Sequence, residues 1–439
     1  MFGYYFGLAL RSLRRNVVLT ALMITAIGVG IGASMTTLTV FRAMAGDPIP
    51  RKSRQLFAVQ IDNWGPSESP STSSADSLPE QISYIDAIGL MNARAAPRQS
   101  AMYYAGAALL PMNPHLRPFL VSMRAAYTDF FAMFDVPFRF GGPWSASDDE
   151  DRARVVVISR ELNDKVFGGA NSVGKILTLD TQDYRVVGVL NHWEPMPKFY
   201  DPSIAKFGEV EQVLLPFTRA IEGHVGSWGD NICPDILPAA PGWDGKLRSE
   251  CVWIQFWAQL PTTADVERYR SFLNNYAVEQ RRLGRFHWAP NTRLRDVHEW
   301  LTHWRVVSAE ARILLVLSFS FLLVCLLNAM GLMLAKFMGR AGDIGLRRAL
   351  GANRAAIFSQ CLIEVGVVGL AGATLGLVMT ALGLLGLRSL LSDEVTRLTH
   401  LGFADIAIAM AVSMFATTLA GLYPTCRAVQ LQPSWQLKA

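Results

Sequence analysis

Four long runs without a charged residue constrain this chain more than any other feature. With the charged residues that bound them, they are Arg15–Arg42 (26 residues between), Arg312–Lys336 (23), Glu364–Arg388 (23) and Asp405–Arg427 (21). A bilayer core of about 30 Å needs roughly 20 helical residues, and a helix satisfies its own backbone hydrogen bonds in lipid. We therefore expect membrane-spanning helices in four segments: 16–46, 308–335, 357–390 and 404–426.

Two other interpretations of these runs are weaker. Buried helices of soluble proteins seldom exceed about 20 residues without a charge, and the chain is only 18% charged, against about 25% in soluble domains. Ala43-Met44-Ala45 resembles a signal-peptidase site. However, the first run is far longer than the roughly 7–15 apolar residues of a signal peptide. We expect a retained helix there.

The basic residues predict the orientation of the helices. Segments 1–16, 335–356 and 425–439 hold ten Lys and Arg residues but one acid, Asp343. The positive-inside rule therefore places both termini in the cytoplasm. Because the net charge of +5 is explained by this asymmetry, it does not indicate a nucleic-acid partner. We expect an interfacial helix over 1–15, a cytoplasmic loop over 336–356, a short external loop over 391–403 and a cytoplasmic tail over 427–439.

The segment 47–307 has the composition of a soluble domain. Alternating or β-branched stretches predict strands at 56–61, 99–110, 116–124, 155–158, 175–179, 184–189 and 252–260, and polar amphipathic stretches predict helices at 80–95 and 264–282. The charged stretch 291–312 is expected to form a helical stalk that continues into the second span. The predicted fold is an α-helical membrane protein with four transmembrane helices and a large α+β external domain inserted between the first and second.

Two motifs look catalytic but lack essential parts. Gly169–Lys175 resembles a phosphate-binding loop, yet Ile176 stands where Ser or Thr must hold magnesium, and a strand follows instead of a helix. His298 and His303 are five residues apart, which places them about 140° apart around a helix, too far to share a zinc ion. We expect no catalytic, metal or cofactor site, and so no enzyme activity in this chain.

Other residues leave alternatives open. Cys233 and Cys251 are the only cysteines outside the helical runs and their flanks, and form either a disulfide on the oxidising side or two free thiols. Glu364, an intramembrane carboxylate, makes a structural hydrogen bond or takes part in coupling. The Gly28/Gly32 and Gly372/Gly376 pairs permit close helix packing, either within the chain or in a dimer.

Several segments carry a family resemblance. Lys336–Ile357 reads KFMGRAGDIGLRRALGANRAAI, and the chain closes with GLYPTCRAVQLQPSWQLKA. These stretches, the opening ALRSLRRN and the external VVVISRELNDKVFGGANSVGKILTLDTQDYRVVGVL resemble the permeases of MacB/FtsX-type ABC transporters, the type VII superfamily. Departures are Asp343, where the family usually has Glu, Cys426, where an aromatic or small residue is common, and the absence of an ATPase domain from this sequence.

The resemblance implies how such a chain works. The loop 336–356 is expected to dock on a separate ATPase subunit, which binds ATP and magnesium. The implied coupling residues are Arg340, Asp343, Ile344, Leu346, Arg347, Arg348, Leu350 and Arg354. The periplasmic domain is expected to comprise a Porter part (about 51–115 and 245–295) and a Sabre-like part (about 116–244). ATP-driven movement of the first two spans would move this domain by mechanotransmission.

The implied partners are an ATPase subunit, a second permease copy or homologue, a periplasmic adaptor with an outer-membrane channel, and inner-membrane lipid. Export or extraction of a macrolide-like compound, peptide, siderophore or lipoprotein is the expected function, at the bacterial inner membrane. The alternative is an FtsX-like regulator that transmits ATPase motion to a cell-wall hydrolase.

Overall fold

A computed structural model of the chain describes residue 11 and residues 15–65, 78–112, 115–233, 241–351, 353–390 and 403–430. The chain forms two compact units. We call them the helical unit (Met1–Ala45 with Val307–Ala439) and the globular unit (Gly46–Val306). Most of the predicted interfacial helix 1–15, nearly all of the loop 391–403 and the tail beyond residue 430 lie outside the described residues.

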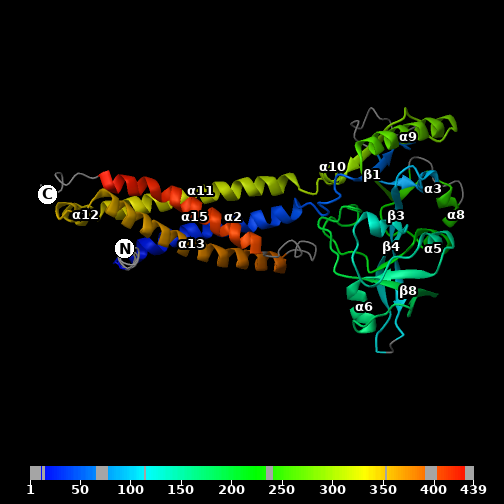
Figure 1. Ribbon diagram of the computed structural model, residues 1–439, viewed down its shortest axis with the longest axis horizontal. Helices are drawn as coiled ribbons and strands as arrows, with labels where there is room; N and C mark the ends of the chain where they lie inside the picture. The colour runs from blue at the N-terminus through cyan, green and yellow to red at the C-terminus, as the bar shows by residue number, and fades with distance from the viewer. Residues whose placement is uncertain are drawn as a thin grey trace. The chain divides into compact units, whose positions relative to one another are not determined.

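The helical unit is built from long helices that run side by side (Figure 1). They are α2 (Val17–Met44), α11 (Ala309–Met338), α13 (Arg354–Leu390) and α15 (Phe403–Gln430), with the short α12 (Ala341–Ala349) between α11 and α13. Among the described residues, three helices are long and apolar enough to cross a membrane, over Val17–Met44, Ala309–Met338 and Arg354–Leu387. The fourth predicted span lies in α15, which packs against α11 and α13. Its crossing stays a prediction.

The apolar core of the helical unit is centred on α2. Met23, Ile27, Ile31 and Met35 recur every four residues along one side of this helix and are buried, as a helix with one stripe of contact requires. They pack in one cluster with residues of α11 and α13, among them Leu322, Ala329, Met333, Val365 and Val368. Helix α2 is therefore held by the two helices that flank α12.

The globular unit contains a mixed sheet of eleven strands among the described residues. Its order is β11 (Thr292–Asp296), β1 (Leu56–Ile61), β10 (Val252–Gln259), β3 (Arg98–Leu110), β4 (Phe119–Ala126), β9 (Val213–Pro216), β6 (Val155–Ile158), β8 (Gln182–Leu190) and β5 (Phe138–Gly141), with β2 (Ile82–Ser83) on β10 and β7 (Ile176–Leu179) on β3 and β8. The β4–β9 and β6–β8 pairs are parallel, and the others antiparallel. The α+β expectation is confirmed.

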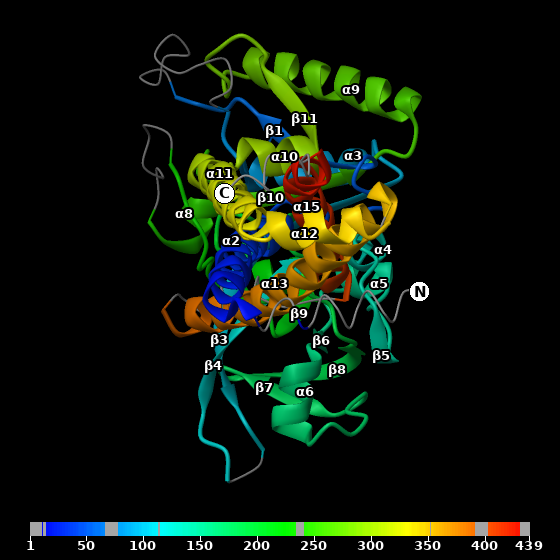
Figure 2. The same cartoon turned by 90° about the vertical axis from the view of Figure 1, so that its left-hand side faces the viewer.

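Helices cover this sheet and its edge. They are α3 (Tyr84–Ala93), α4 (Asp129–Met133), α5 (Ala146–Glu150), α6 (Arg160–Phe167), α7 (Phe217–Glu222), α8 (Gly242–Leu247), α9 (Thr263–Arg282) and α10 (Val297–His303). The longest, α9, lies beside the edge strand β11 (Figure 2). Thr262 begins it with a capping box, in which its hydroxyl accepts from the amide of Asp265. Every residue of β10 is buried, as is every residue of the shorter strands β6 and β9.

The expectation of a continuous helical stalk over 291–312 is wrong. Residues Thr292–Asp296 instead form β11, which pairs with β1, and Asp296 then caps the short α10. Helix α11 begins later, where the Ser308 hydroxyl accepts from the Ala311 amide. The alternation of Thr292, Leu294 and Asp296 suits an edge strand. Pairing with β1 therefore stabilises a strand here, although the charge-rich composition favours a helix.

The structure describes the backbone and contacts of the two catalytic look-alikes. Gly168 ends α6 in the left-handed conformation, and Gly174 (φ +87°) makes the turn that enters β7. His298 and His303 contact different carboxylates, Asp47 at 3.3 Å and Glu80 at 3.4 Å. Within the described ranges, no group of three or more His, Cys, Asp or Glu residues could hold a metal ion.

Candidate functional site

The predicted coupling residues lie on and around α12, and the structure divides them between two faces. Ile344 packs against the core of the helical unit, and the Arg347 guanidinium donates to Gln360 Oε1 of α13 at 2.9 Å. Leu346 and Leu350 are 63% and 80% exposed. One face therefore anchors α12 to the bundle, while the other presents two large apolar side chains.

The remaining predicted coupling residues have different surroundings. Arg340 precedes α12 and approaches Glu364, whereas Arg354 opens α13 with an exposed side chain. Asp343 and Arg348 lie on α12, and their side chains are outside the described part of the structure. The segment that the sequence predicts as one docking loop thus contains a short helix. Some of its predicted coupling residues contact the helical bundle, and others are exposed.

Glu364 has a cationic partner that sequence reasoning did not assign. Lys336 Nζ, from the last turn of α11, forms an ion pair with Glu364 Oε1, and Arg340 Nη1 lies 3.7 Å from Oε2. The side chains of Lys336 and Glu364 are 1% and 5% exposed. Because a lone buried charge is costly among apolar helices, this pair ties the end of α11 to α13.

One sequence signal could have found this pair. Lys336 ends the second charge-free run and Glu364 begins the third, so an antiparallel arrangement of the two spans brings the boundary charges to the same depth. Sequence reasoning also missed Gln360, the acceptor for Arg347. An uncharged polar residue inside an apolar helix gives no indication of its partner.

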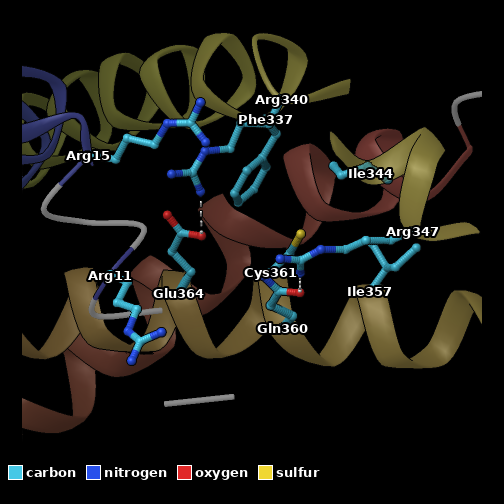
Figure 3. Close-up of a pocket in the computed structure, with 10 residues that line it drawn as sticks. All are labelled: Arg11, Arg15, Phe337, Arg340, Ile344, Arg347, Ile357, Gln360, Cys361 and Glu364. Atoms are coloured by element: carbon cyan, nitrogen blue, oxygen red, sulfur yellow. Dashed lines mark hydrogen bonds and ion pairs between the residues drawn. The ribbon is translucent and has the colours of Figure 1, made fainter. Parts of the chain in front are cut away.

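A pocket of about 190 Å³ opens beside the Lys336–Glu364 pair (Figure 3). Its walls come from the N-terminal segment, the end of α11, α12 and α13. The lining residues are Arg11, Arg15, Phe337, Arg340, Ile344, Arg347, Ile357, Gln360, Cys361 and Glu364. In Figure 3, Arg15 extends from the N-terminal segment toward Arg340, whereas the Arg11 side chain points away from the Glu364 carboxylate. The pocket thus combines four arginines with apolar walls.

The two glycine motifs face each other within the chain. A Cβ on Gly32 of α2 would lie 2.5 Å from Met379 Cβ, and one on Gly376 of α13 would lie 2.7 Å from Ile31 Cγ2. The same close approach matches Gly28 with Leu375 and Gly372 with Ile27. The glycines therefore allow α2 and α13 to pack in direct contact within the chain.

The cysteines separate by location. Cys233 and Cys251 form a disulfide in the globular unit, next to the bridge between Ile232 and Val252. Cys325 and Cys361 are buried thiols in the helical unit, and Cys426 is exposed. Cys361 also lines the pocket. The disulfide joins Cys233, which precedes the undescribed segment 234–240, to Cys251, which directly precedes β10.

Comparison with known proteins agrees with this architecture. The sequence model of the MacB-like periplasmic core domain matches residues 20–272, and that of the FtsX-like permease C-terminal region matches residues 315–433. The first match alone covers more than half of the chain. The chain belongs to the MacB/FtsX family of ABC-transporter permeases. It is thus a membrane permease with a MacB-like periplasmic domain, here the globular unit.

Individual relatives are distant. The macrolide export ATP-binding/permease protein MacB of Salmonella typhi is 25% identical over 309 residues, which cover 70% of this permease and 41% of the relative. MacB of Escherichia coli O6:K15:H31 is 24% identical over 443 residues, covering 97% and 59%. The chain therefore spans about two fifths to three fifths of these relatives. The periplasmic region of MacB from Actinobacillus actinomycetemcomitans aligns with 57% of this chain and 92% of its own, at 12% identity and a TM-score of 0.36.

Proposed function

We propose that this permease couples ATP hydrolysis by a separate ATPase subunit to movement of its periplasmic domain, which drives export or extraction of a substrate. The observation that carries the proposal is the two-faced α12. Ile344 and the hydrogen bond from Arg347 to Gln360 attach α12 to the bundle, while Leu346 and Leu350, the residue after its end, are left exposed. Exposed leucines surrounded by arginines suit an apolar groove with an acidic rim.

The connections of the helices support transmission of force in preference to transport through the bundle. α2 leads into the globular unit after Met44, and α11 follows that unit from Ala309. The two helices pack against each other, and the Ser34 hydroxyl of α2 donates to the Ser318 carbonyl of α11 at 3.0 Å. A displacement of α12 that moves α11 would therefore also move α2, and with them both chain connections to the globular unit.

The proposed assembly has further parts. We expect both termini in the cytoplasm, four spans in the bacterial inner membrane, ATP and magnesium on the ATPase subunit, and a second permease copy or homologue. The most apolar stretch of α11 is only 17% buried within the chain, against 44% for those of α2 and α13. The exposed apolar surface of α11 is therefore available to that second copy or to lipid. A periplasmic adaptor and an outer-membrane channel, and the Porter and Sabre-like division, stay predictions.

Association with the ATPase tests the proposal. Leu346→Asp or Leu350→Asp places a charge in the proposed groove and should weaken co-purification of an ATP-hydrolysing subunit by about thirtyfold or more, the effect of losing a central apolar anchor. Leu283→Asp, an equally exposed leucine of the globular unit, is the matched control and should leave association unchanged. Wild-type association in both α12 variants would rule out α12 as the docking element.

Co-purification also separates the exporter from the regulator. Recovery of an adaptor together with the ATPase agrees with export, whereas recovery of a cell-wall hydrolase would favour the FtsX-like alternative. Because the periplasmic core-domain match extends over residues 20–272, we favour export.

A further inference from the structure

We propose that the arginine-lined pocket between the N-terminal segment, α11, α12 and α13 binds the phosphate group of an anionic phospholipid. The inference rests on the proposed function for the orientation that places this pocket in the cytoplasmic leaflet. There it would hold one lipid headgroup against the inner side of the coupling helix.

The chemistry of the lining selects a phosphate. Four lining residues are arginines, Arg11, Arg15, Arg340 and Arg347. The one carboxylate among the lining residues, Glu364, is ion-paired with Lys336 and with Arg340. The lining therefore carries an excess of positive charge. A guanidinium presents a planar set of donors that matches phosphate oxygens in pairs, which a lysine ammonium cannot do. Arg347 uses one donor on Gln360 and has five in total.

The apolar part of the lining favours a lipid over a free anion. Phe337, Ile344 and Ile357 share the pocket with the arginines, and such side chains offer nothing to a hydrated inorganic ion. At about 190 Å³ the pocket is much larger than a water site, which needs only about 10–15 Å³ by the same measure. Basic pockets between membrane helices on the cytoplasmic side are suited to anionic headgroups.

The proposed lipid would contact both α12 and the segment that leads into α2. Ile344 and Arg347 belong to α12, Arg340 approaches the Lys336–Glu364 pair, and Arg11 and Arg15 belong to the segment that leads into α2. A phosphate contacted by arginines from both segments would link α12 to the beginning of α2. Anionic lipid would then raise the mechanical coupling between the two elements.

Native mass spectrometry of the full chain, purified in detergent, tests the proposal directly. Palmitoyl-oleoyl phosphatidylglycerol should stay bound at one molecule per chain, whereas palmitoyl-oleoyl phosphatidylcholine should not. The double variant Arg11→Gln/Arg15→Gln should weaken phosphatidylglycerol retention by about thirtyfold. Arg427→Gln, which removes an exposed arginine of α15 outside the pocket, is the matched control and should retain the lipid.

Three results would overturn the proposal. They are equal retention of the two lipids by the wild type, wild-type retention by the double variant, and full displacement of phosphatidylglycerol by inorganic phosphate, which would indicate a site for a free anion. The wild-type comparison decides even if the double variant is unstable. Since the assay contains no ATPase, its failure is distinct from failure of the docking test on Leu346 and Leu350.

Discussion

At the scale of single residues, both units bury charge and neutralise it by direct pairing. In the globular unit, the Arg124 guanidinium is fully buried between Asp201, at 2.7 Å, and Glu211. Lys198 Nζ lies 2.7 Å from Glu211 Oε1, and the Tyr200 hydroxyl donates to Oε2 at 2.9 Å. This cluster fixes the long irregular segment between β8 and β9 to β4, because each of its carboxylates needs a cation once buried.

The first prediction concerns acid stability of the globular unit. Burial by itself raises the pKa of Glu211, but Arg124 and Lys198 outweigh it and hold the pKa at about 2. Because the pKa of Glu211 is lower in the folded chain than its ordinary value of about 4.5, the ionised carboxylate stabilises the folded state at pH values above 4.5. This contribution is lost as the pH falls toward 2. We expect the free energy of unfolding to fall by roughly 3 kcal/mol through Glu211 over this window.

Denaturant unfolding of the full chain, followed by tryptophan fluorescence, measures this effect, because every tryptophan except Trp435 lies between residues 64 and 304. Glu211→Gln should be less stable at pH 7 and less dependent on pH between 4.5 and 2. Glu209→Gln, an exposed neighbour on the same segment, should follow the wild type. An unchanged pH slope in Glu211→Gln would contradict the prediction.

The second prediction concerns the pair in the helical unit. Glu364→Leu leaves Lys336 buried without its carboxylate and should destabilise the chain by about 3–5 kcal/mol, since breaking a buried pair costs more than removing it. The double variant Lys336→Met/Glu364→Leu should recover a large part of this loss. Thermal unfolding in detergent measures both, with Glu310→Leu, an exposed acid of α11, as the control. Additive losses in the double variant would show that the pair does not couple α11 to α13.

At the scale of elements, α2 depends on small residues facing both of its neighbours. Gly32 meets Met379 of α13, while a Cβ on Gly30 would lie 3.0 Å from Cys325 Cβ of α11. Without a driving force from water inside a bilayer, helices associate through such close van der Waals contact and interhelical hydrogen bonds. Close packing against α11 and α13 therefore fixes the position of α2, the helix that leads into the globular unit.

The third prediction enlarges these contacts. Gly32→Val or Gly376→Val forces α2 and α13 apart and should cost about 1–3 kcal/mol, the usual loss on overpacking a close contact. Gly366→Ala is the matched control, because a Cβ at this position of α13 meets nothing within 4 Å. Melting temperatures in detergent provide the comparison. Unchanged melting of both valine variants would mean that the two helices are not in contact at these glycines.

At the scale of the whole molecule, the two units have separate cores and separate chemistry. The globular unit has an oxidised cysteine pair and a mixed sheet, and the helical unit has free thiols and an arginine-rich loop region. Disulfides persist on the periplasmic side and are rare in the cytoplasm. The disulfide and the positive-inside pattern thus favour the same orientation.

The fourth prediction tests that orientation. In a background without Cys325, Cys361 and Cys426, Gly342→Cys on α12 should react with a membrane-impermeant maleimide only after spheroplasts are permeabilised. Met112→Cys, at a site of the globular unit that is 78% exposed, should react in intact spheroplasts and is the control for access. Reaction of Gly342→Cys in intact spheroplasts would show that α12 is on the periplasmic side. This would contradict the predicted orientation and the proposal that an ATPase docks at α12.

The sequence by itself determined the features that depend on local pattern and composition. Charge-free runs located α2, α11 and α13, because lipid excludes charge over a fixed thickness. Short apolar stretches rich in β-branched residues located strands such as Leu56–Ile61 and Val155–Ile158 at their observed bounds, because such side chains favour extended backbone. The family motifs located α12 and its neighbourhood.

Only the tertiary structure decided which distant residues meet. Arg124 is 77 residues from Asp201 and 87 from Glu211 along the chain, and no local pattern carries such a pairing. The same holds for Lys336 with Glu364, for the glycines of α2 with those of α13, and for 292–296, which became a strand only because β1 offered a free edge. The packed chain determines these pairings. A buried charge, or an unpaired backbone group at the edge of a strand, is stabilised by the groups that the fold places next to it, and these are distant in the sequence.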